Sequence, residues 1–487
     1  MFKNINCKNL PSLRRNIVYQ FLYELLIVFI PLFTIPYVSR VLGAENIGLF
    51  SYTYAVANYF VLFANLGIKN YGSRTIAMVR NNKEELNRNF SEILSIHIIF
   101  SIIVIFVYLV LLFFFVEDNL VIFLIQSIYV FAAVFDINWF FFGIEKFKLT
   151  VGRNTLVKIL SVFLVLVFVK TQTDLWIYAL ILALSVFVGQ SVVWFALKQY
   201  VSWRRPSWAN MKQHIRPLFV LFLPILALSL YKYMDKIMLG SISSNVQVGF
   251  YENAEKIINV PMSLIMAFGV VLMPRIANMV TSKDKGEVFK LIDMSMEAVM
   301  LLAIAISFGL AGISFVLAPI FFGYEFEECG ILIMGLAVTV PFMAFANVIR
   351  TQYLIPYKED KIFVVSLFLG AAVILIVNII LIPYMAARGA VIGTIFAEII
   401  VCIYQSYFVR KKIFIKKYLL NTIPPILIGI VMFVFVFQIG NVMNINIVTL
   451  ILQLLVGMFI YAVGVFLLML KSRTRLMVLL RKFVVRY

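Results

Sequence analysis

Charged side chains interrupt one of the most apolar stretches of the chain, and they do so at helical spacing. Lys232, Asp235 and Lys236 directly follow the end of the apolar run PLFVLFLPILALSL at 217–230. On a helix, positions i, i+3 and i+4 share one face, so the three charges form a stripe. Each charge would cost about 2.5–3.5 kcal/mol at the centre of a bilayer, so we expect the stripe to face the protein interior.

Other apolar stretches contain charges as well. Glu252, Glu255 and Lys256 share one helical face, whereas Asp136 and Glu398 stand alone. Cations at two depths of a membrane protein suit an anionic headgroup, because lysine and arginine both bind phosphate. Carboxylates between them would exchange protons if burial raises their pKa. A second interpretation is that these charges pair with one another and only fasten helices together. The cations concerned are Lys158, Lys232, Lys236 and Arg350, and the carboxylates are Glu24, Asp136, Asp235, Glu252, Glu255 and Glu398.

The elements that carry these charges follow from the composition. The 487 residues are 63% hydrophobic and 13% charged, with a mean hydropathy of +1.01. Soluble domains have roughly 45–50% apolar and about 25% charged residues. Continuous apolar runs of about 20 residues predict membrane-spanning helices and not the short alternating segments of a barrel. The predicted fold class is therefore an all-α polytopic membrane protein.

Fourteen membrane-spanning helices are predicted from these runs. With both termini in the cytoplasm, 34 of the 42 Lys and Arg residues fall in cytoplasmic segments, as the positive-inside rule requires. The net charge of +19 then faces anionic lipid headgroups and does not indicate a nucleic-acid partner. The spans lie near 16–38, 46–66, 93–116, 119–142, 151–170, 175–197, 217–240, 247–273, 291–320, 330–355, 361–383, 388–409, 420–439 and 445–470.

An internal repeat divides the chain. NIGLFSYTYAVANYF (46–60) and QVGFYENAEKIINVP (247–261) align at an offset that pairs Phe50 with Tyr251. Parallel repeats of this kind are a transporter architecture. We therefore predict two parallel six-helix lobes followed by two further helices. The predicted domains are residues 1–200 (spans 1–6), 201–415 (spans 7–12) and 416–487 (spans 13–14 and a basic cytoplasmic tail).

Several kinds of site are not indicated. The three cysteines, Cys7, Cys329 and Cys402, have no paired spacing for a disulfide framework or a zinc site. His97 and His214 are too few and too far apart for a histidine-based catalytic or metal cluster. No phosphate-cradling G-x-x-x-x-G-K-[ST] sequence is present, and no cleavable signal is evident. We expect no catalytic residue, metal or cofactor.

Two segments carry a resemblance to a known family. They are YKYMDKIMLG with VGFYENAEKI, at 231–240 and 248–257, and PYVSRVLGAENIGLFSYTYAVANYF at 36–60. Both resemble the polysaccharide flippase (Wzx-type, O-antigen and capsule repeat-unit) family of the multidrug/oligosaccharidyl-lipid/polysaccharide exporter superfamily. The resemblance covers the whole length of the chain, including the fourteen spans and the twofold repeat.

The resemblance implies a V-shaped pair of six-helix lobes around a cationic central cavity, in a bacterial plasma membrane. It implies a flippase, not an enzyme, that moves undecaprenyl-diphosphate-linked oligosaccharide repeat units to the outer leaflet by alternating access, for capsule or O-antigen synthesis. Expected partners are this lipid-linked substrate, a polysaccharide polymerase, a chain-length regulator, and anionic lipids at the cytoplasmic basic loops.

The resemblance also implies residue roles. Family members bind their substrate through cavity cations, a role that transfers to five candidates: Arg40, Lys158, Lys232, Lys236 and Arg350. Coupling to a proton gradient or to the membrane potential is expected by analogy, with Glu24, Asp136 and Glu398 as the candidate carboxylates.

Other functions predict different features. A multidrug extruder of the same superfamily would bind cationic drugs in a cavity dominated by carboxylates. A membrane polysaccharide polymerase would usually present a large outside loop, and a glycosyltransferase an acidic loop motif. The predicted outside loops, such as SISSNVQ at 241–247, are short. A non-catalytic scaffold of an export complex would not need charges in so many spans.

Overall fold

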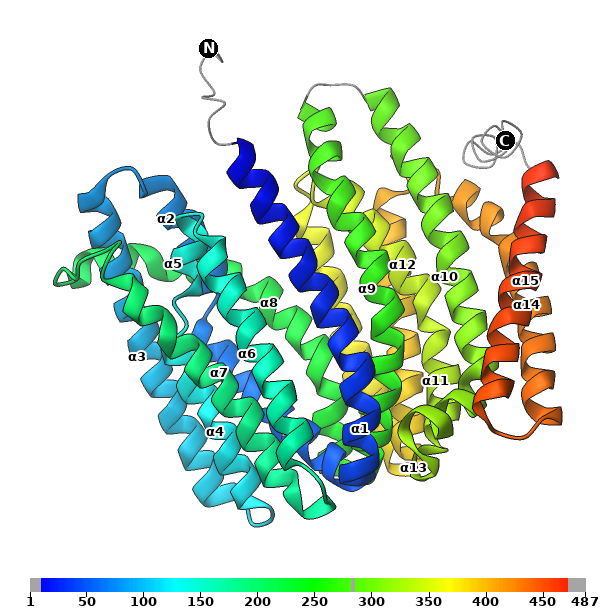
Figure 1. Ribbon diagram of the computed structural model, residues 1–487. Coiled ribbons are helices and arrows are strands. Elements are labelled where there is room, and N and C mark those ends of the chain that lie inside the picture. The colour runs from blue at the N-terminus through cyan, green and yellow to red at the C-terminus, as the bar shows by residue number, and fades with distance from the viewer. Residues whose placement is uncertain (1–9, 282–284, 472–487) are drawn as a thin grey trace. The chain divides into compact units, whose positions relative to one another are not determined.

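The computed structural model describes residues 10–281 and 285–471, and within its helices the side chains of 10–29, 31–32, 147–148, 281, 285 and 471 are not described. The described chain folds into helices joined by short connections (Figure 1). The first eight are α1 (Leu10–Asn65), α2 (Ile68–Val79), α3 (Lys83–Phe115), α4 (Leu120–Val134), α5 (Asn138–Gly143), α6 (Phe147–Phe168), α7 (Leu175–Leu197) and α8 (Trp208–Ile242). The others are α9 (Asn245–Thr281), α10 (Lys285–Phe322), α11 (Cys329–Ala337), α12 (Thr339–Ile349), α13 (Asp360–Val409), α14 (Ile415–Val442) and α15 (Ile447–Lys471).

Twelve helical stretches of the described residues are long and apolar enough to cross a membrane. Helices are stable in the hydrocarbon of a bilayer because their backbone N–H and C=O groups form hydrogen bonds within the same helix. The chain is therefore a multi-pass membrane protein. It divides into two units, unit 1 (Met1–Ser229) and unit 2 (Leu230–Tyr487), and the boundary falls inside α8.

Unit 1 packs around aromatic side chains. Trp139 of α5 stacks on Phe90 of α3 at 5.5 Å between ring centroids, and Phe140 meets the same Phe90 edge-on at 4.9 Å. All three are almost completely buried. The start of α3 is set by Asn82, whose side chain accepts hydrogen bonds from two backbone N–H groups of the first turn. This core holds α2, α3, α5 and the first half of α8 together.

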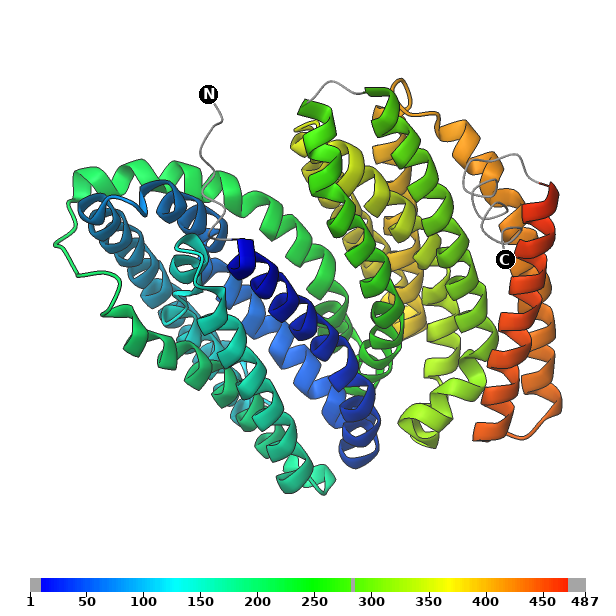
Figure 2. The same ribbon diagram turned by 45° about the horizontal axis from the view of Figure 1, so that its top comes forward.

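Helix α1 is interrupted near its middle. Gly43 has a φ of 77° and a ψ of 173°, a conformation that glycine adopts without the steric cost of a Cβ. Figures 1 and 2 both show the chain turning back after the dark blue first part of α1. The 56 residues of α1 thus form two helical segments.

Helix α13 is a hairpin of two helical segments that turn at Ala386, where φ is 47°. A Cβ on Gly389 would lie 2.7 Å from the Leu381 carbonyl group, and one on Gly393 would lie 2.3 Å from the side-chain oxygen of Asn378. Residues eight to fifteen positions apart meet in this way only where the chain reverses. The two glycines let the segments approach closely, and Gln405 donates a hydrogen bond to Ser366 at 2.8 Å farther along the pair.

In unit 2, α10 packs against α11, α12 and α14, and α14 packs against α15. Both views show α14 and α15, in orange and red, side by side (Figures 1 and 2). A second set of contacts joins α9 to α11 and α12 to α13. This second set carries most of the buried charge described below.

Candidate functional site

The three charged residues of the α8 stripe, Lys232, Asp235 and Lys236, each contact different residues in unit 2. Lys236 lies 2.6 Å from Glu252 and 2.9 Å from Glu255 of α9, and Lys256 lies 3.1 Å from Glu252. Lys236 is 7% exposed. Two ammonium groups and two carboxylates therefore form one neutral cluster that fastens α8 to α9. Such a pairing offsets the large desolvation cost of each ion.

Asp235, the neighbour of Lys236 in the chain, contacts no cation among the described residues. Its carboxylate accepts hydrogen bonds from the amide of Asn378 at 2.6 Å, the hydroxyl of Tyr251 at 2.8 Å and the hydroxyl of Thr394 at 3.3 Å. It is 4% exposed. A buried carboxylate with three neutral donors carries an uncompensated charge, so this position suits the binding of a proton or a small cation. The direct ion-pair partners of Lys236 are therefore Glu252 and Glu255 of α9, and not the adjacent Asp235.

Lys232 differs from the rest of the stripe. Its side chain is exposed, and its ammonium lies 5.4 Å from the ring centroid of Tyr233. Among the described residues it forms no ion pair. Spacing alone predicts a common face for Lys232, Asp235 and Lys236, yet only the last two are buried. Of the three charges in the stripe, Lys232 is thus the cation whose ammonium remains accessible to an anionic ligand.

Arg350 and Glu398 form a second charged site in unit 2. Arg350 opens a π-helical turn, Arg350–Leu354 (η4), that follows α12. Its guanidinium donates a hydrogen bond to Asn347 at 2.6 Å and lies over the ring of Phe363 at 5.3 Å. Glu398, on the second segment of α13, is 4% exposed and interacts electrostatically with Arg350 without a direct ion pair in the described chain. π-Helical turns often occur at functional sites.

Unit 1 contributes Lys158 and Asp136. Lys158 lies half-buried on α6, and it has no ion-pair partner among the side chains that the structure describes. Asp136 accepts hydrogen bonds from the backbone and side-chain amides of Asn138, at 3.0 and 2.7 Å. Asn138 in turn contacts Gln190 and Arg153. This polar network joins α5, α6 and α7, so Asp136 is occupied by contacts that fasten helices.

Two candidates on α1 complete the set. Arg40 is exposed and lies three residues before the kink at Gly43. It already interacts with another residue of the protein. Glu24 belongs to the first segment of α1, but its side chain lies outside the described ones.

Residue spacing did not reveal several groups that complete these sites. Tyr251, Asn378 and Thr394 supply all three donors to Asp235, and two of them come from α13, more than 140 positions away. The only local signal is an amide and a hydroxyl placed in otherwise apolar helical segments.

In unit 1, His214 lies 3.0 Å from Glu92 and 2.6 Å from the hydroxyl of Tyr71. Nothing in the spacing of these three side chains predicts that they meet.

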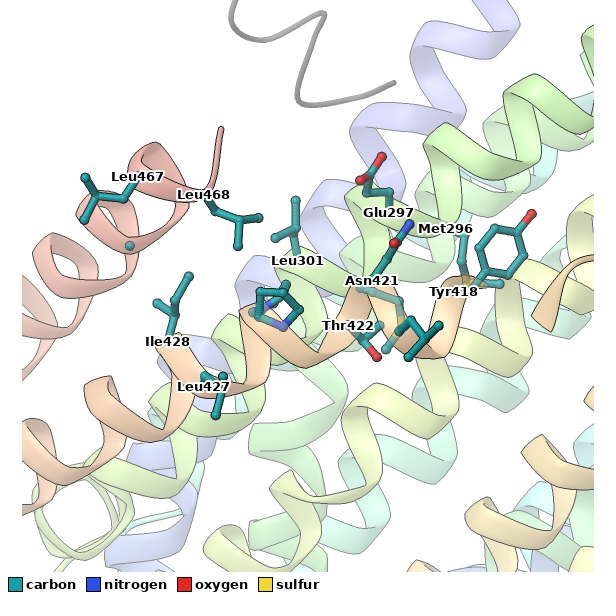
Figure 3. Close-up of a pocket in the computed structure, with 15 residues that line it drawn as sticks. Met296, Glu297, Leu301, Tyr418, Asn421, Thr422, Leu427, Ile428, Leu467 and Leu468 are labelled. Carbon is teal, nitrogen blue, oxygen red and sulfur yellow. The ribbon is translucent and has the colours of Figure 1, made fainter. Parts of the chain in front are cut away.

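Cavities in unit 2 lie apart from these charged groups. One of about 620 Å³ and one of about 950 Å³ open between α10, α14 and α15. Neither is lined by a residue that the sequence singled out. Figure 3 shows the first of them, with lining side chains from all three helices.

Known proteins resemble this chain over most of its length. A model of the family described as "Polysaccharide biosynthesis protein" matches residues 13–280. A putative O-antigen transporter of Shigella dysenteriae is 24% identical over 408 residues, covering 81% of this chain and 99% of that protein. A putative O-antigen transporter of Escherichia coli (strain K12) is 26% identical over 411 residues, covering 83% and 98%.

A solved structure shares the fold. "Lipid II flippase MurJ, inward closed conformation" superposes with a TM-score of 0.71 at 16% identity, covering 92% of this chain and 97% of that one. At this identity the likeness concerns the fold alone.

Proposed function

Because the chain belongs to the polysaccharide biosynthesis protein family, we propose that it is a flippase for lipid-linked oligosaccharides. Its substrate is an undecaprenyl-diphosphate-linked repeat unit, which it moves from the cytoplasmic to the outer leaflet by alternating access, for capsule or O-antigen synthesis. The nearly full-length relatives named as putative O-antigen transporters support a transporter and not an enzyme.

The observation that carries this proposal is a set of cations inside apolar helices that form no direct ion pair with any described carboxylate. Lys232 and Arg350 in unit 2, and Lys158 in unit 1, are of this kind. Charges in membrane helices are rare and mark substrate or ion pathways. A diphosphate is the part of the substrate that such cations would bind. Lys236 and Arg40 remain candidates, although Lys236 is already saturated by Glu252 and Glu255.

The energy for transport requires a second set of groups. We assign ion coupling to Asp235 and Glu398, because each is a buried carboxylate without a direct ion pair in the described residues. Binding of a driving proton or cation there would neutralise a charge that the apolar surroundings disfavour. Glu252 and Glu255 have a pairing role in this scheme, and Asp136 and Glu24 remain further coupling candidates.

The proposed layout in the membrane has fourteen crossings with both termini in the cytoplasm. Twelve apolar stretches are found, and two of the helices involved, α1 and α13, are each interrupted at a positive φ. Counting each of their segments as one crossing adds two. The proposed domains remain 1–200, 201–415 and 416–487, in a bacterial plasma membrane. A polymerase, a chain-length regulator and anionic lipids at the basic loops are the proposed partners.

The experiment that tests the function is leaflet-resolved quantification of lipid-linked oligosaccharide in cells depleted of this protein. We expect intact repeat units to accumulate on the cytoplasmic leaflet and to clear when the wild-type chain is restored. Repeat units that accumulate on the outer leaflet would instead indicate a polymerase. An unchanged distribution, together with increased sensitivity to cationic drugs, would indicate a multidrug extruder.

A further inference from the structure

The two cavities of unit 2 together have a polar end and an apolar interior. They share Leu301 as a lining residue, so they are neighbours along α10. Each falls within the usual size of a ligand pocket, about 300–1,000 Å³. Leu427 and Leu467, which line the smaller one, are each 59% exposed. In a membrane protein such exposed leucines face lipid, so this cavity opens toward the bilayer.

The smaller cavity holds the polar end. Figure 3 shows Glu297, Tyr418, Asn421 and Thr422 grouped toward one end, whereas the leucine and isoleucine side chains gather toward the other. The amide of Asn421 forms no hydrogen bond with other described residues. Tyr418, Asn421 and Thr422 lie in the first turns of α14, and Glu297 lies on α10. The beginning of a membrane-spanning helix lies near the surface of the membrane.

Two consecutive prolines strengthen the polar character of this end. Pro424 and Pro425 have no N–H, so the carbonyls of Leu420 and Asn421 lose their usual helical partners. All four residues line the cavity. Carbonyl groups near a membrane surface need hydrogen-bond donors, which the hydroxyl groups of a lipid headgroup can supply.

The larger cavity is almost entirely hydrocarbon. Its lining comes from α10, α14 and α15, with Pro261 of α9. The polar groups in this lining already have partners. The Tyr461 hydroxyl donates a hydrogen bond to the Leu301 carbonyl at 2.7 Å, and the Gln453 amide donates one to the Val436 carbonyl at 2.9 Å. The remaining surface suits an alkyl chain, because both are apolar and gain van der Waals contacts when they pack together.

Cations directly precede the polar end along the chain. Five of them, Arg410, Lys411, Lys412, Lys416 and Lys417, occupy the connection into α14 and its first turn. Lys417 forms an ion pair with Asp293 at 2.7 Å, and its ammonium lies 6.0 Å from the ring of Tyr418, which lines the cavity. The carboxylates of α10 near this end are Asp293 and Glu297, fewer than the five cations. The excess of positive charge favours an anionic headgroup.

We infer that unit 2 binds an anionic phospholipid of the bilayer between α10, α14 and α15. The acyl chains enter the apolar cavities, and the phosphate meets the cations of 410–417, in the cytoplasmic leaflet under the topology proposed above. A glycerol headgroup fits best, because it carries a single negative charge at its phosphate and hydroxyl donors for the carbonyls that the prolines leave. This site is distinct from the charged groups assigned to transport and does not depend on that function.

The test uses the full chain, purified in mild detergent and mixed with phosphatidylglycerol or phosphatidylcholine, with bound lipid counted by native mass spectrometry. We expect phosphatidylglycerol to be retained and phosphatidylcholine to be lost. The double variant Lys412→Gln/Lys416→Gln should weaken retention by about fivefold for each cation removed. Leu427→Trp, at the exposed lip of the cavity, should reduce retention without a change in charge.

The matched control is Arg205→Gln/Lys212→Gln, which removes two exposed cations from unit 1 and should leave retention unchanged. Equal retention of the two phospholipids, or equal losses from the control and the unit 2 variants, would refute the site. Undecaprenyl phosphate that is retained in place of phosphatidylglycerol, and lost in Leu427→Trp, would also overturn the proposal and identify a prenyl chain as the occupant.

Discussion

Asp235 and Lys236 are adjacent in the chain, but their surroundings give them opposite tasks. Lys236 has two carboxylates within 3 Å, so its charge is neutralised by fixed partners. Asp235 has only neutral donors from Tyr251, Asn378 and Thr394. The first arrangement is a lock between helices, whereas the second leaves a charge that a mobile ion can neutralise.

Substitutions at Asp235 separate these tasks. Asp235→Asn keeps the shape and removes the charge, so we expect normal membrane insertion with most export lost. Asn378→Leu removes the shortest hydrogen bond to the carboxylate and should lower stability by about 1.5–3 kcal/mol, as for a bond to a charged group. Thermal unfolding in detergent and an export assay measure the two effects. Full export by Asp235→Asn would exclude ion coupling at this residue.

Lys232 provides a second residue-level prediction. Because its ammonium is exposed and has no ion pair among the described residues, Lys232→Ala should impair export with little loss of inserted protein. Lys232→Arg should restore much of the activity if charge alone matters. The amount of surface polysaccharide, normalised to protein in the membrane, is the measurement. Lys83→Ala, at an exposed cation that begins α3, is the control. Normal export by Lys232→Ala would remove this residue from the substrate path.

Local spacing predicted part of this chemistry. Glu252, Glu255 and Lys256 share a helical face by sequence, and the structure brings that face to Lys236. Spacing could not identify the donors to Asp235, because Asn378 and Thr394 reach it only through the folding of α13. A single polar residue in an apolar helix has no periodicity, so its partner cannot be read from the sequence. The roles of all these residues in transport stay predictions.

At the scale of elements, the α13 hairpin positions two of those donors. Asn378 lies on the first segment and Thr394 on the second, and the close approach at Gly393 keeps them together. Gly393→Ala would place a Cβ 2.3 Å from the Asn378 side-chain oxygen. We expect a loss of about 1–3 kcal/mol through overpacking, measured by thermal unfolding.

A control distinguishes this effect from helix propensity. Gly152 on α6 has open space around the position of a Cβ, so Gly152→Ala should be neutral or stabilising, by up to about 1 kcal/mol. If both alanine variants behave alike, the close packing of the hairpin contributes nothing measurable. A drop in export for Gly393→Ala beyond the loss of folded protein would connect the hairpin to Asp235.

A second element-scale contact fastens the first half of α8 to α2 and α3. The His214 Nε2–H group donates to Glu92 at 3.0 Å, and Nδ1 accepts from the Tyr71 hydroxyl at 2.6 Å. Asn210 donates to the other carboxylate oxygen of Glu92 at 3.0 Å. Both Glu92 and His214 are almost fully buried. This chain of hydrogen bonds satisfies a carboxylate that would otherwise be costly inside the unit.

His214→Phe keeps a ring of similar shape and removes both hydrogen bonds. We expect a loss of roughly 1.5–3 kcal/mol, because the buried Glu92 loses a charge-assisted bond. His97→Phe is the matched control in the same unit, since both ring nitrogens of His97 lack hydrogen-bond partners within the described residues. Midpoints of thermal unfolding decide the outcome, and equal shifts for the two variants would show that the His214 contacts do not stabilise α8.

For the whole molecule, hydropathy predicted the helical class and nearly every long helix. Some predicted limits agree with the helices to within a few residues, as for α7 and α15, because insertion length follows the thickness of the bilayer. Others do not: α3 begins at 83 and not at 93, α8 begins at 208 and not at 217, and α9 ends at 281 and not at 273. The reversal inside α13, at Ala386, falls in the break expected between 383 and 388. Hydropathy does not predict tertiary contacts, so it could not predict how the chain divides into two units.

The fourteen-crossing layout can be tested by labelling single cysteines from outside the cell, after replacement of the native cysteines. Residues 45 and 384 lie at the turns of α1 and α13, and both are exposed. We expect Glu45→Cys and Tyr384→Cys to be labelled by a membrane-impermeant reagent, and Lys358→Cys only after permeabilisation. Protection of 45 and 384 from the outside reagent would reduce the number of crossings to twelve.

The ion pairs between α8 and α9 also bear on how the chain is made. A ribosome delivers α8 to the membrane before α9, and at that moment Lys232, Asp235 and Lys236 have no partners from the later helix. Each would cost about 2.5–3.5 kcal/mol near the bilayer centre. Once Glu252 and Glu255 arrive, Lys236 is neutralised at 2.6 and 2.9 Å. We therefore expect the insertion machinery to retain α8 in its aqueous channel until α9 has been synthesised. The ion pairs that stabilise the folded unit then favour release of α8 and α9 into the lipid as a pair.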